Sequence, residues 1–327
     1  MSRGLSSLLL LATACRPPCG ATAAPAPAPD VAVDIVHRRV TEGEIKDLVW
    51  KRGADATYAP TTARERAGVT ALVAAMIAAA DAGAADPAWA QAAAQTGFRL
   101  EAWDVGGTTF WALVEADPRG AGAYFVRAGS GADDAAIVLE APHVYYDLLT
   151  EDIGARLFFR RGPWRRPRAF FTNTIHRHQL EPGKRVRRPD SPADVTHNPD
   201  HVYTAATEAA ARALAGAVVI QLHGFGQSAD DGAVPPGTDM VISSGDRAGS
   251  SEASAARAAG LKKLVAGARR FPEDADALGA TTNVQMHVLR GVPGAAFVHI
   301  EMSSPARRAL VADAAKLAAF ARVLFGE

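Results

Sequence analysis

Histidines directly follow three of the apolar segments in this sequence. His143 comes after AAIVLE, His176 and His178 come after AFFTNT, and His223 comes after AVVIQL. A fourth apolar segment carries Glu301 near its end. Neutral imidazoles and carboxylates are the groups that hold a catalytic zinc ion. The placement of these residues therefore indicates a metal-dependent active site to which several segments contribute.

His143 and His223 are the predicted ligands of one Zn²⁺. A catalytic zinc ion uses three protein ligands and keeps one position open for water, so a carboxylate near His143 is expected as the third ligand. Asp147 lies four residues further on and shares a face with His143 if the intervening VYY forms a helical turn. Glu140 lies three residues before His143 and still belongs to the apolar segment. We expect Asp147 to be the third ligand, with Glu140 as the alternative.

The segments before these residues are predicted strands, and amphipathic helices separate most of them. Apolar strands between helices indicate an α/β fold whose mostly parallel, mixed sheet is covered by helices on both faces, of the phosphorylase/hydrolase-like kind. Ligands of such sheets bind beyond the carboxyl ends of the strands, where the histidines lie. The predicted strands are 98–103, 109–115, 123–127, 135–140, 169–174, 217–222, 240–243, 283–289 and 296–302, and the predicted helices include 66–80, 200–214, 252–270 and 305–324.

The first thirty residues are predicted to be a signal peptide and a tether rather than part of the fold. Arg3 precedes a short apolar run that cannot span a bilayer. Residues 21–23 (Ala-Thr-Ala) fit a signal-peptidase site, whereas Cys15 after Ala-Thr-Ala fits a lipoprotein box that would give a lipid anchor. The alternating Ala and Pro of 21–29 indicate an extended tether. The sequence thus predicts an exported protein, either periplasmic or extracellular, or lipid-anchored to a bacterial membrane.

Composition excludes several other classes of protein. The 35 basic residues balance the 35 acidic ones, so nucleic acid is not an expected partner. Both cysteines, Cys15 and Cys19, lie in the N-terminal segment, which excludes a disulfide scaffold and a cysteine-ligated zinc finger. The remaining 31–327 are expected to form one catalytic α/β domain in which 31–100 is an N-terminal helical elaboration.

Over residues 135–310 the candidate residues resemble those of a known group in type, spacing and order. The pattern resembles the zinc carboxypeptidase and N-formylglutamate amidohydrolase group, which has the poly-gamma-glutamate hydrolases as relatives. The matching residues are Glu140-Ala-Pro-His143-x3-Asp147-x2-Thr150, Asn173-x3-Arg177, Leu222-His223-Gly224 and His299-Ile-Glu301-Met-Ser303-x3-Arg307.

The resemblance implies a mixed α/β sheet and one zinc ion on two histidines and a carboxylate. It also implies that Glu301 is the general base, and that Arg177 binds the substrate's carboxylate or polarises its carbonyl. One position departs from the group, in which a glutamate follows the first histidine by three residues. That position is Tyr146 here, so the choice between Asp147 and Glu140 stays open.

The predicted activity is that of an exported zinc-dependent amidohydrolase or carboxypeptidase-like hydrolase. It would cleave an amide bond next to a carboxylate-bearing group in a peptide, a peptidoglycan stem or an N-acyl amino acid. Zinc lowers the pKa of water to about 7, Glu301 can accept the proton, and Arg177 can bind the carboxylate.

Residues 151–190 hold eleven basic side chains against four acids. They form either a positive rim that attracts an anionic substrate or an ordinary solvated surface. Residues 194–197 (Asp-Val-Thr-His) lie in a Pro-rich loop after this segment. This loop either folds over the site or caps the helix that begins at Asp200, and His197 is a candidate to support the ligands.

Two other classes of function are alternatives. The HGFGQS segment that starts at His223 resembles the oxyanion-hole loop of α/β-hydrolases, but the sequence has no G-x-S-x-G nucleophile motif. A serine hydrolase would have to use Ser251 with His287 or His299. The remaining alternative is a non-enzymatic exported binding protein with a degenerate site. Inhibition by a chelator separates the zinc enzyme from the serine hydrolase, and metal content separates it from the binding protein.

Overall fold

The computed structural model describes residues 33–187, 190–226 and 234–327. The predicted signal peptide, the tether and both cysteines therefore lie outside the described residues, as do Arg188 of the basic segment and the Gln-Ser end of HGFGQS. Val33–Glu327 forms one compact unit. Among the described residues, none of the helices has the length and apolar character that a bilayer crossing needs.

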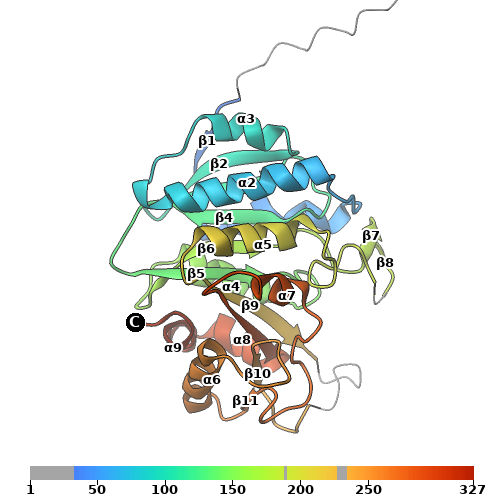
Figure 1. Cartoon of the computed structure of the whole chain (residues 1–327), viewed down its shortest axis with the longest axis vertical. Helices are drawn as coiled ribbons and strands as arrows, with labels where there is room; N and C mark the ends of the chain where they lie inside the picture. Colours follow the sequence, from blue (N-terminus) through green and yellow to red (C-terminus); the bar gives the residue numbers. More distant parts are fainter. Residues whose placement is uncertain (1–32, 188–189, 227–233) are drawn as a thin grey trace, which may run out of the picture. The chain divides into compact units, whose positions relative to one another are not determined.

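Ten strands of the described residues form one mixed sheet (Figure 1). Its spatial order is β1-β2-β3-β4-β6-β5-β9-β12-β10-β11, and β6, β5, β9 and β12 are parallel neighbours at its centre. The strands are β1 (Val36–Arg39), β2 (Phe98–Val105), β3 (Thr108–Glu115), β4 (Ala123–Arg127), β5 (Asp134–Ala141), β6 (Arg166–Thr172), β9 (Val218–Phe225), β10 (Met240–Ser243), β11 (Ala268–Arg270) and β12 (Ala296–Ser303), while β7 (Gln179–Glu181) and β8 (Lys184–Arg185) pair in a separate hairpin.

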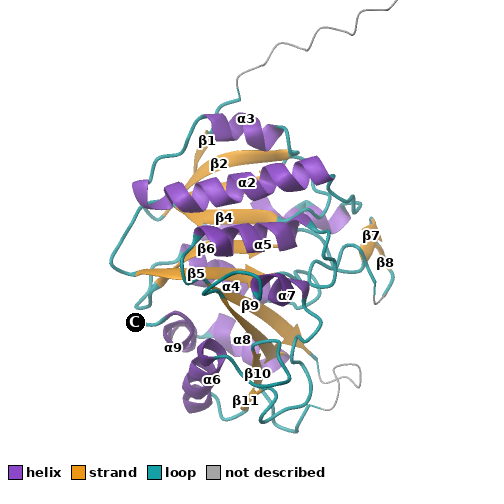
Figure 2. Cartoon of the chain, in the orientation of Figure 1, coloured by secondary structure: helices purple, strands orange, loops and turns teal. Residues whose placement is uncertain are grey.

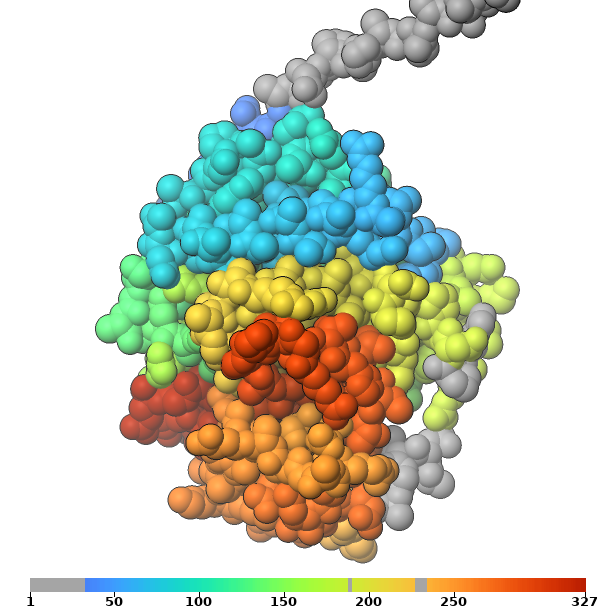
Figure 3. Space-filling view, in the orientation of Figure 1, coloured from blue at the N-terminus to red at the C-terminus, as the bar shows by residue number. Residues whose placement is uncertain are grey.

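Helices cover both faces of this sheet (Figure 2), which confirms the predicted α/β architecture. One face carries α2 (Ala63–Ala79), α3 (Ala88–Ala94), α5 (Val202–Ala213) and α7 (Val284–Leu289). Figure 3 shows α2, α5 and α7 side by side on this face. The other face carries α1 (Glu42–Lys46), α4 (Thr150–Phe159), α6 (Glu252–Leu264), α8 (Ser304–Ala312) and α9 (Ala314–Phe325).

The central strands carry a row of polar side chains on the face that α5 and α7 cover. Gln221 of β9 is in register with Glu140 of β5 on one side and with His299 of β12 on the other. One step nearer the carboxyl ends of the strands, His223 is in register with Glu301. Alternate residues of a strand share a face, so all five side chains point the same way. The residues between them are apolar and pack into the core under α4 and α8.

The predicted strand 283–289 is wrong, because Val284–Leu289 is helix α7. Asn283 explains the difference: its side-chain oxygen accepts a hydrogen bond from the backbone N–H of Met286 at 3.0 Å, as a helix N-cap does. Met286 and Leu289 are both buried, three positions apart on one side of the helix. In a segment of six residues, the apolar pattern alone did not separate a helix from a strand.

Three further elements differ from their predicted bounds. The helix predicted over 252–270 ends at Leu264, and Ala268–Arg270 joins the sheet as the edge strand β11, parallel to β10. The closing helix is divided at Asp313, whose carboxylate caps α9 by accepting from the N–H groups of Ala315 and Lys316. The mostly helical N-terminal region also contains β1, which pairs parallel with β2.

Candidate metal centre

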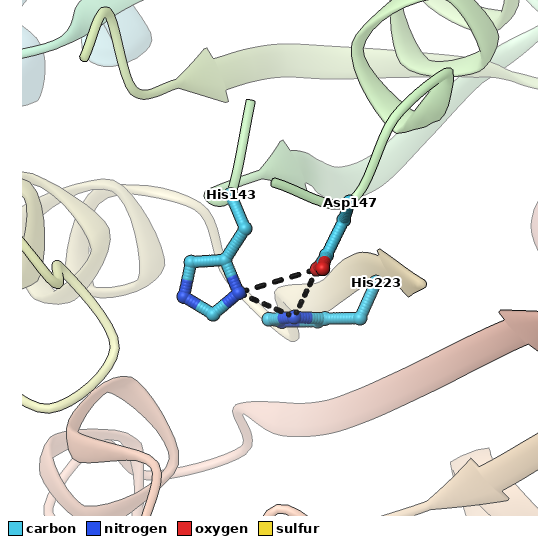
Figure 4. Close-up of side chains that lie close together, drawn as sticks. All are labelled: His143, Asp147 and His223. Atoms are coloured by element: carbon cyan, nitrogen blue, oxygen red, sulfur yellow. Dashed lines mark hydrogen bonds and ion pairs between the residues drawn. The ribbon is translucent and has the colours of Figure 1, made fainter. Parts of the chain in front are cut away.

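Three ligand atoms converge where β5 and β9 end (Figure 4). Nδ1 of His143 lies 3.1 Å from Nδ1 of His223, and each of these nitrogens lies 3.2 Å from Oδ2 of Asp147. His143 and Asp147 come from the turn after β5, which is closed by a hydrogen bond of 2.8 Å from the Asp147 N–H to the His143 carbonyl. Tyr145 has a left-handed φ of 65°, so this turn brings the two side chains together without the expected helical conformation. All three side chains are buried, with exposures of 2–3%.

The tautomer of His223 is fixed by a chain of hydrogen bonds that starts at the backbone. The carbonyl of Val195 can only accept, so the amide nitrogen of Gln285 must face it, at 2.7 Å. The amide oxygen of Gln285 therefore faces Nε2 of Gln221, at 3.2 Å. This leaves Oε1 of Gln221 to accept from Asn283 Nδ2 at 2.7 Å and from Nε2 of His223 at 3.2 Å. His223 thus carries its proton on Nε2, and Nδ1 presents a lone pair to the site.

An acidic partner fixes His143 in the same way. Its Nε2 lies 3.0 Å from Oδ1 of Asp194 and 3.0 Å from Oγ1 of Thr196. Burial alone would raise the pKa of Asp194, but His143, His197 and Arg177 outweigh it and hold that pKa well below its usual range. Asp194 is therefore a carboxylate acceptor that keeps the His143 proton on Nε2. The Nδ1 atom of His143 then also directs a lone pair at the site.

A cation between these three atoms would offset the repulsion of their lone pairs. Around a tetrahedral zinc ion with bonds of about 2.0 Å, neighbouring ligand atoms are about 3.3 Å apart, close to the separations of 3.1 and 3.2 Å found here. The donor set of two imidazoles and one carboxylate suits zinc as well as other transition metals. His143, Asp147 and His223 could therefore hold a metal ion.

The charges of the three ligands follow from their burial and their partners. Burial alone would raise the pKa of Asp147, but hydrogen bonds and charges from both histidines hold it below its usual range. Burial lowers the pKa of His223 to about 4, so this ring is neutral near pH 7. Burial and Arg177 oppose protonation of His143, yet Asp194 and Asp147 outweigh them and raise its pKa. A proton on His143 is thus the alternative to a metal cation in this triangle.

Glu301, the predicted base, lies beside the ligands on the neighbouring strand β12. A carboxylate oxygen of Glu301 and ring nitrogens of His223 and His299 all lie within 4.8 Å of one another. The Glu301 side chain is 13% exposed, and its Oε1 atom is 3.6 Å from Nε2 of His299. Arg307, on the first turn of α8, donates to the Met302 carbonyl and to Ser304.

Arg177, the predicted substrate-binding arginine, also reaches the site. Its Nη2 pairs with Oδ2 of Asp194, and its Nη1 lies 3.3 Å from Nδ1 of His143. The guanidinium lies over the ring of Tyr146, 5.1 Å from its centre. His197 supports this arrangement, because its Nδ1 lies 3.1 Å from the same Asp194 oxygen.

These side chains line a cleft of about 540 Å³. Of the eleven basic residues of 151–190, Arg177 and Arg187 belong to its lining within the described residues. The others that the structure describes lie elsewhere; Arg160, for example, pairs with Glu42. The basic segment therefore does not form a continuous rim around the cleft.

Glu140, the alternative third ligand, lies behind the metal centre rather than in it. Its carboxylate accepts from Thr207 at 2.5 Å and from Gln221 at 2.6 Å, so it is linked to His223 only through Gln221. Complete burial raises the pKa of Glu140 to about 7, although both hydrogen bonds act against this rise.

Several other candidates are not brought together as a site. Ser251 caps α6 by accepting from the Ser254 N–H at 3.2 Å, and the described residues show no hydrogen bond from it to a histidine. His287 is exposed on α7. His176 and His178 meet the edge of the Tyr146 ring, and of these two His178 lines the cleft.

The sequence reasoning missed the residues that orient the two histidines. Gln221 and Gln285 lie within predicted strands, and Asp194 lies in the Pro-rich loop that holds His197. A signal for Gln221 was present, because an uncharged amide inside the buried run AVVIQL needs partners for all of its polar atoms. The signal for Gln285 was hidden by the incorrect strand at 283–289.

Comparisons with known proteins give little beyond this geometry. No protein-family model matches the chain, and no curated protein matches it. Among solved structures, a match is a bacteriophage poly-gamma-glutamate hydrolase, with 14% identity, a TM-score of 0.34, and coverage of 57% of this chain and 80% of that chain. At this TM-score the likeness does not bear on function.

We predict that Gln221→Met weakens zinc binding about 10–100-fold, the usual effect of removing the group that orients a histidine ligand. Competition with a chelating dye measures the zinc Kd directly, and circular dichroism verifies that the variant is folded. Thr207→Val is the matched control, since it breaks the same buried network at Glu140 without touching Gln221. An unchanged Kd in Gln221→Met would show that this contact does not orient His223.

We also predict that Glu140→Gln removes a pH-dependent loss of stability. The pKa of Glu140 is about 7 in the folded state and near 4.5 in the unfolded state. As the pH rises, the unfolded state loses this proton first, so the wild type loses stability between these two values. The free energy of unfolding of the variant should therefore rise relative to that of the wild type from pH 5 to pH 8, by up to about 3 kcal/mol. The substituted amide fits, because the Thr207 hydroxyl can donate to the Tyr203 carbonyl instead. Urea unfolding at several pH values measures the difference, and a constant difference would contradict the prediction.

Proposed function

We propose that this protein is a zinc-dependent hydrolase that cleaves an amide bond next to a carboxylate-bearing group. The observation that carries the proposal is the convergence of three lone pairs, from His143, Asp147 and His223, at the floor of a cleft. A fourth group, the carboxylate of Glu301, lies beside them on β12. A purely structural histidine cluster has no need of such a carboxylate at the open side.

The bound zinc ion would supply Lewis acidity and lower the pKa of water to about 7. The part of Glu301 is to accept the proton of that water and return it to the leaving amine. The position of Glu301 fits this part, because its carboxylate lines the cleft beside His223. His299, on the same face of β12, limits the positions that the Glu301 side chain can take.

Arg177 is proposed to recognise the substrate's carboxylate. Asp194 holds the guanidinium through Nη2, which leaves Nη1 on the cleft side beside His143. A guanidinium fixed at one end suits directional hydrogen bonding to an oxyanion. The cleft volume suits a peptide end, a peptidoglycan stem or an N-acyl amino acid.

Export is part of the proposal on the strength of residues 1–30 alone. Arg3 and the apolar run after it resemble a signal peptide, and Cys15 resembles the acceptor of a lipid anchor. Zinc-dependent processing of peptides or cell-wall fragments agrees with that location.

We predict that the wild type carries about one zinc ion per chain and that His223→Ala and Asp147→Ala each lose it. Two remaining ligands compete poorly with water and buffer for the ion. Mass-spectrometric metal analysis of the purified proteins measures the stoichiometry. His178→Ala, which alters a histidine of the same cleft outside the triangle, should keep its zinc. Full zinc occupancy in either ligand variant would refute the metal centre.

We predict that Glu301→Gln keeps its zinc but lowers kcat about 10²–10⁴-fold, because the amide has the shape of the carboxylate and cannot accept a proton. Turnover is measured on N-acyl amino acids, peptides with a free C-terminal carboxylate and peptidoglycan stem peptides, each with and without chelator. Wild-type turnover in Glu301→Gln would remove Glu301 from the reaction. Turnover that persists with chelator would refute zinc dependence.

A further inference from the structure

A second polar pocket lies at the opposite edge of the sheet from the metal centre. Thr108 begins β3, Arg127 ends β4 and Arg166 begins β6, and the antiparallel pairing of these strands brings the three residues to one edge. The pocket between them has a volume of about 370 Å³. The eight residues of β5 separate this edge from His143, a span of about 25 Å at about 3.3 Å per residue.

Two arginines beside this pocket are fully engaged in ion pairs. Arg127 pairs with Asp134 at 2.5 Å and also donates to the Pro167 carbonyl. Arg168 pairs with Asp134 at 2.7 Å and with Asp81 at 2.6 Å. These contacts use Asp134 and Asp81 and leave neither carboxylate to a further cation.

Two more arginines, Arg161 and Arg166, lack such partners. Among residues 33–187, 190–226 and 234–327, no carboxylate forms an ion pair with either of them. Arg161 donates to Oγ1 of Thr108 at 3.3 Å, and Arg166 reaches the same oxygen at 3.4 Å. Arg166 is only 7% exposed. Asp133 lines the pocket too, and its single charge does not balance two guanidinium groups.

A buried guanidinium without an ion-pair partner is unfavourable unless an anion compensates its charge. Burial, with the nearby charge of Arg127, lowers the pKa of Arg166 to about 10, and Asp133 and Asp134 offset only part of this change. Glycines form much of the remaining wall, namely Gly83, Gly107, Gly129 and Gly131. Glycines without side chains let a ligand approach the backbone closely.

We propose that this pocket binds a phosphate oxyanion, as inorganic phosphate or as a phosphomonoester, between Arg161 and Arg166. Two guanidinium groups facing one space match the several oxygens of phosphate better than the two of a single carboxylate. The site is independent of the metal centre and of the activity proposed for it.

Titration calorimetry of the full-length protein with inorganic phosphate, at constant ionic strength, tests the proposal. Wild type should bind one phosphate, and Arg166→Met and Arg161→Met should each lower the affinity at least about tenfold. Arg64→Met, at an exposed arginine of α2, is the matched control and should bind as wild type does. Arg177→Gln should also bind as wild type does, since Arg177 belongs to the metal cleft.

Three outcomes would overturn the proposal. The first is no saturable binding of phosphate by wild type. The second is equal binding by Arg161→Met and wild type, a test that stays valid if Arg166→Met does not fold, because Arg161 is exposed. The third is loss of binding in Arg177→Gln, which would place the phosphate in the cleft. Titration with glucose 6-phosphate tests whether the pocket binds a phosphomonoester as well as inorganic phosphate. Tighter binding of citrate than of either phosphate compound would show that the pocket prefers a carboxylate ligand.

Discussion

The hydrogen bond from Nε2 of His223 to the amide oxygen of Gln221 determines what the centre of this protein can bind. If the Gln221 amide were reversed, its NH2 group would face the ring, and the His223 proton would move to the nitrogen that faces His143. The triangle would then have a proton where it now has a lone pair. The direction of the Gln221 amide follows from the Val195 carbonyl by way of Gln285, and it therefore does not depend on the ligand. A cation could therefore enter the triangle without any change in the His223 tautomer.

The positions of the site residues could be predicted from the sequence because they follow from the geometry of parallel strands. His143 and His223 follow strands that run in the same direction, so the two residues meet at one edge. Glu301 joins them because β12 pairs with β9 in register. Asp147 could be preferred to Glu140 as the third ligand only as an expectation, because the choice depends on the conformation of the turn after β5.

The orienting residues could not be found in the same way, because their role lies in partners far along the chain. Gln221 depends on Gln285, which is 64 positions away, and hydrophobic patterning gives no information on such pairs. The short segment 283–289 shows a second limit: in seven residues the apolar periods of helix and strand overlap. Asn283, the helix cap, was the discriminating residue.

The arginines of 151–190 are clustered along the sequence but are dispersed in the folded protein. Strand β6 passes through the sheet within this segment. Arg166, at its start, and Arg177, beyond its end, therefore lie at opposite edges. What looks like one basic rim in the sequence is divided between the metal cleft, a separate arginine pocket and ordinary surface ion pairs.

Asn283 joins two tasks that are usually separate. Its Oδ1 atom caps α7, and its Nδ2 atom holds the amide oxygen of Gln221. Any opening of the first turn of α7 therefore releases a group that fixes the metal centre, and occupation of the centre opposes that opening by mass action. Amide exchange in this helix would consequently report how full the metal centre is, although no backbone amide of α7 is itself a ligand.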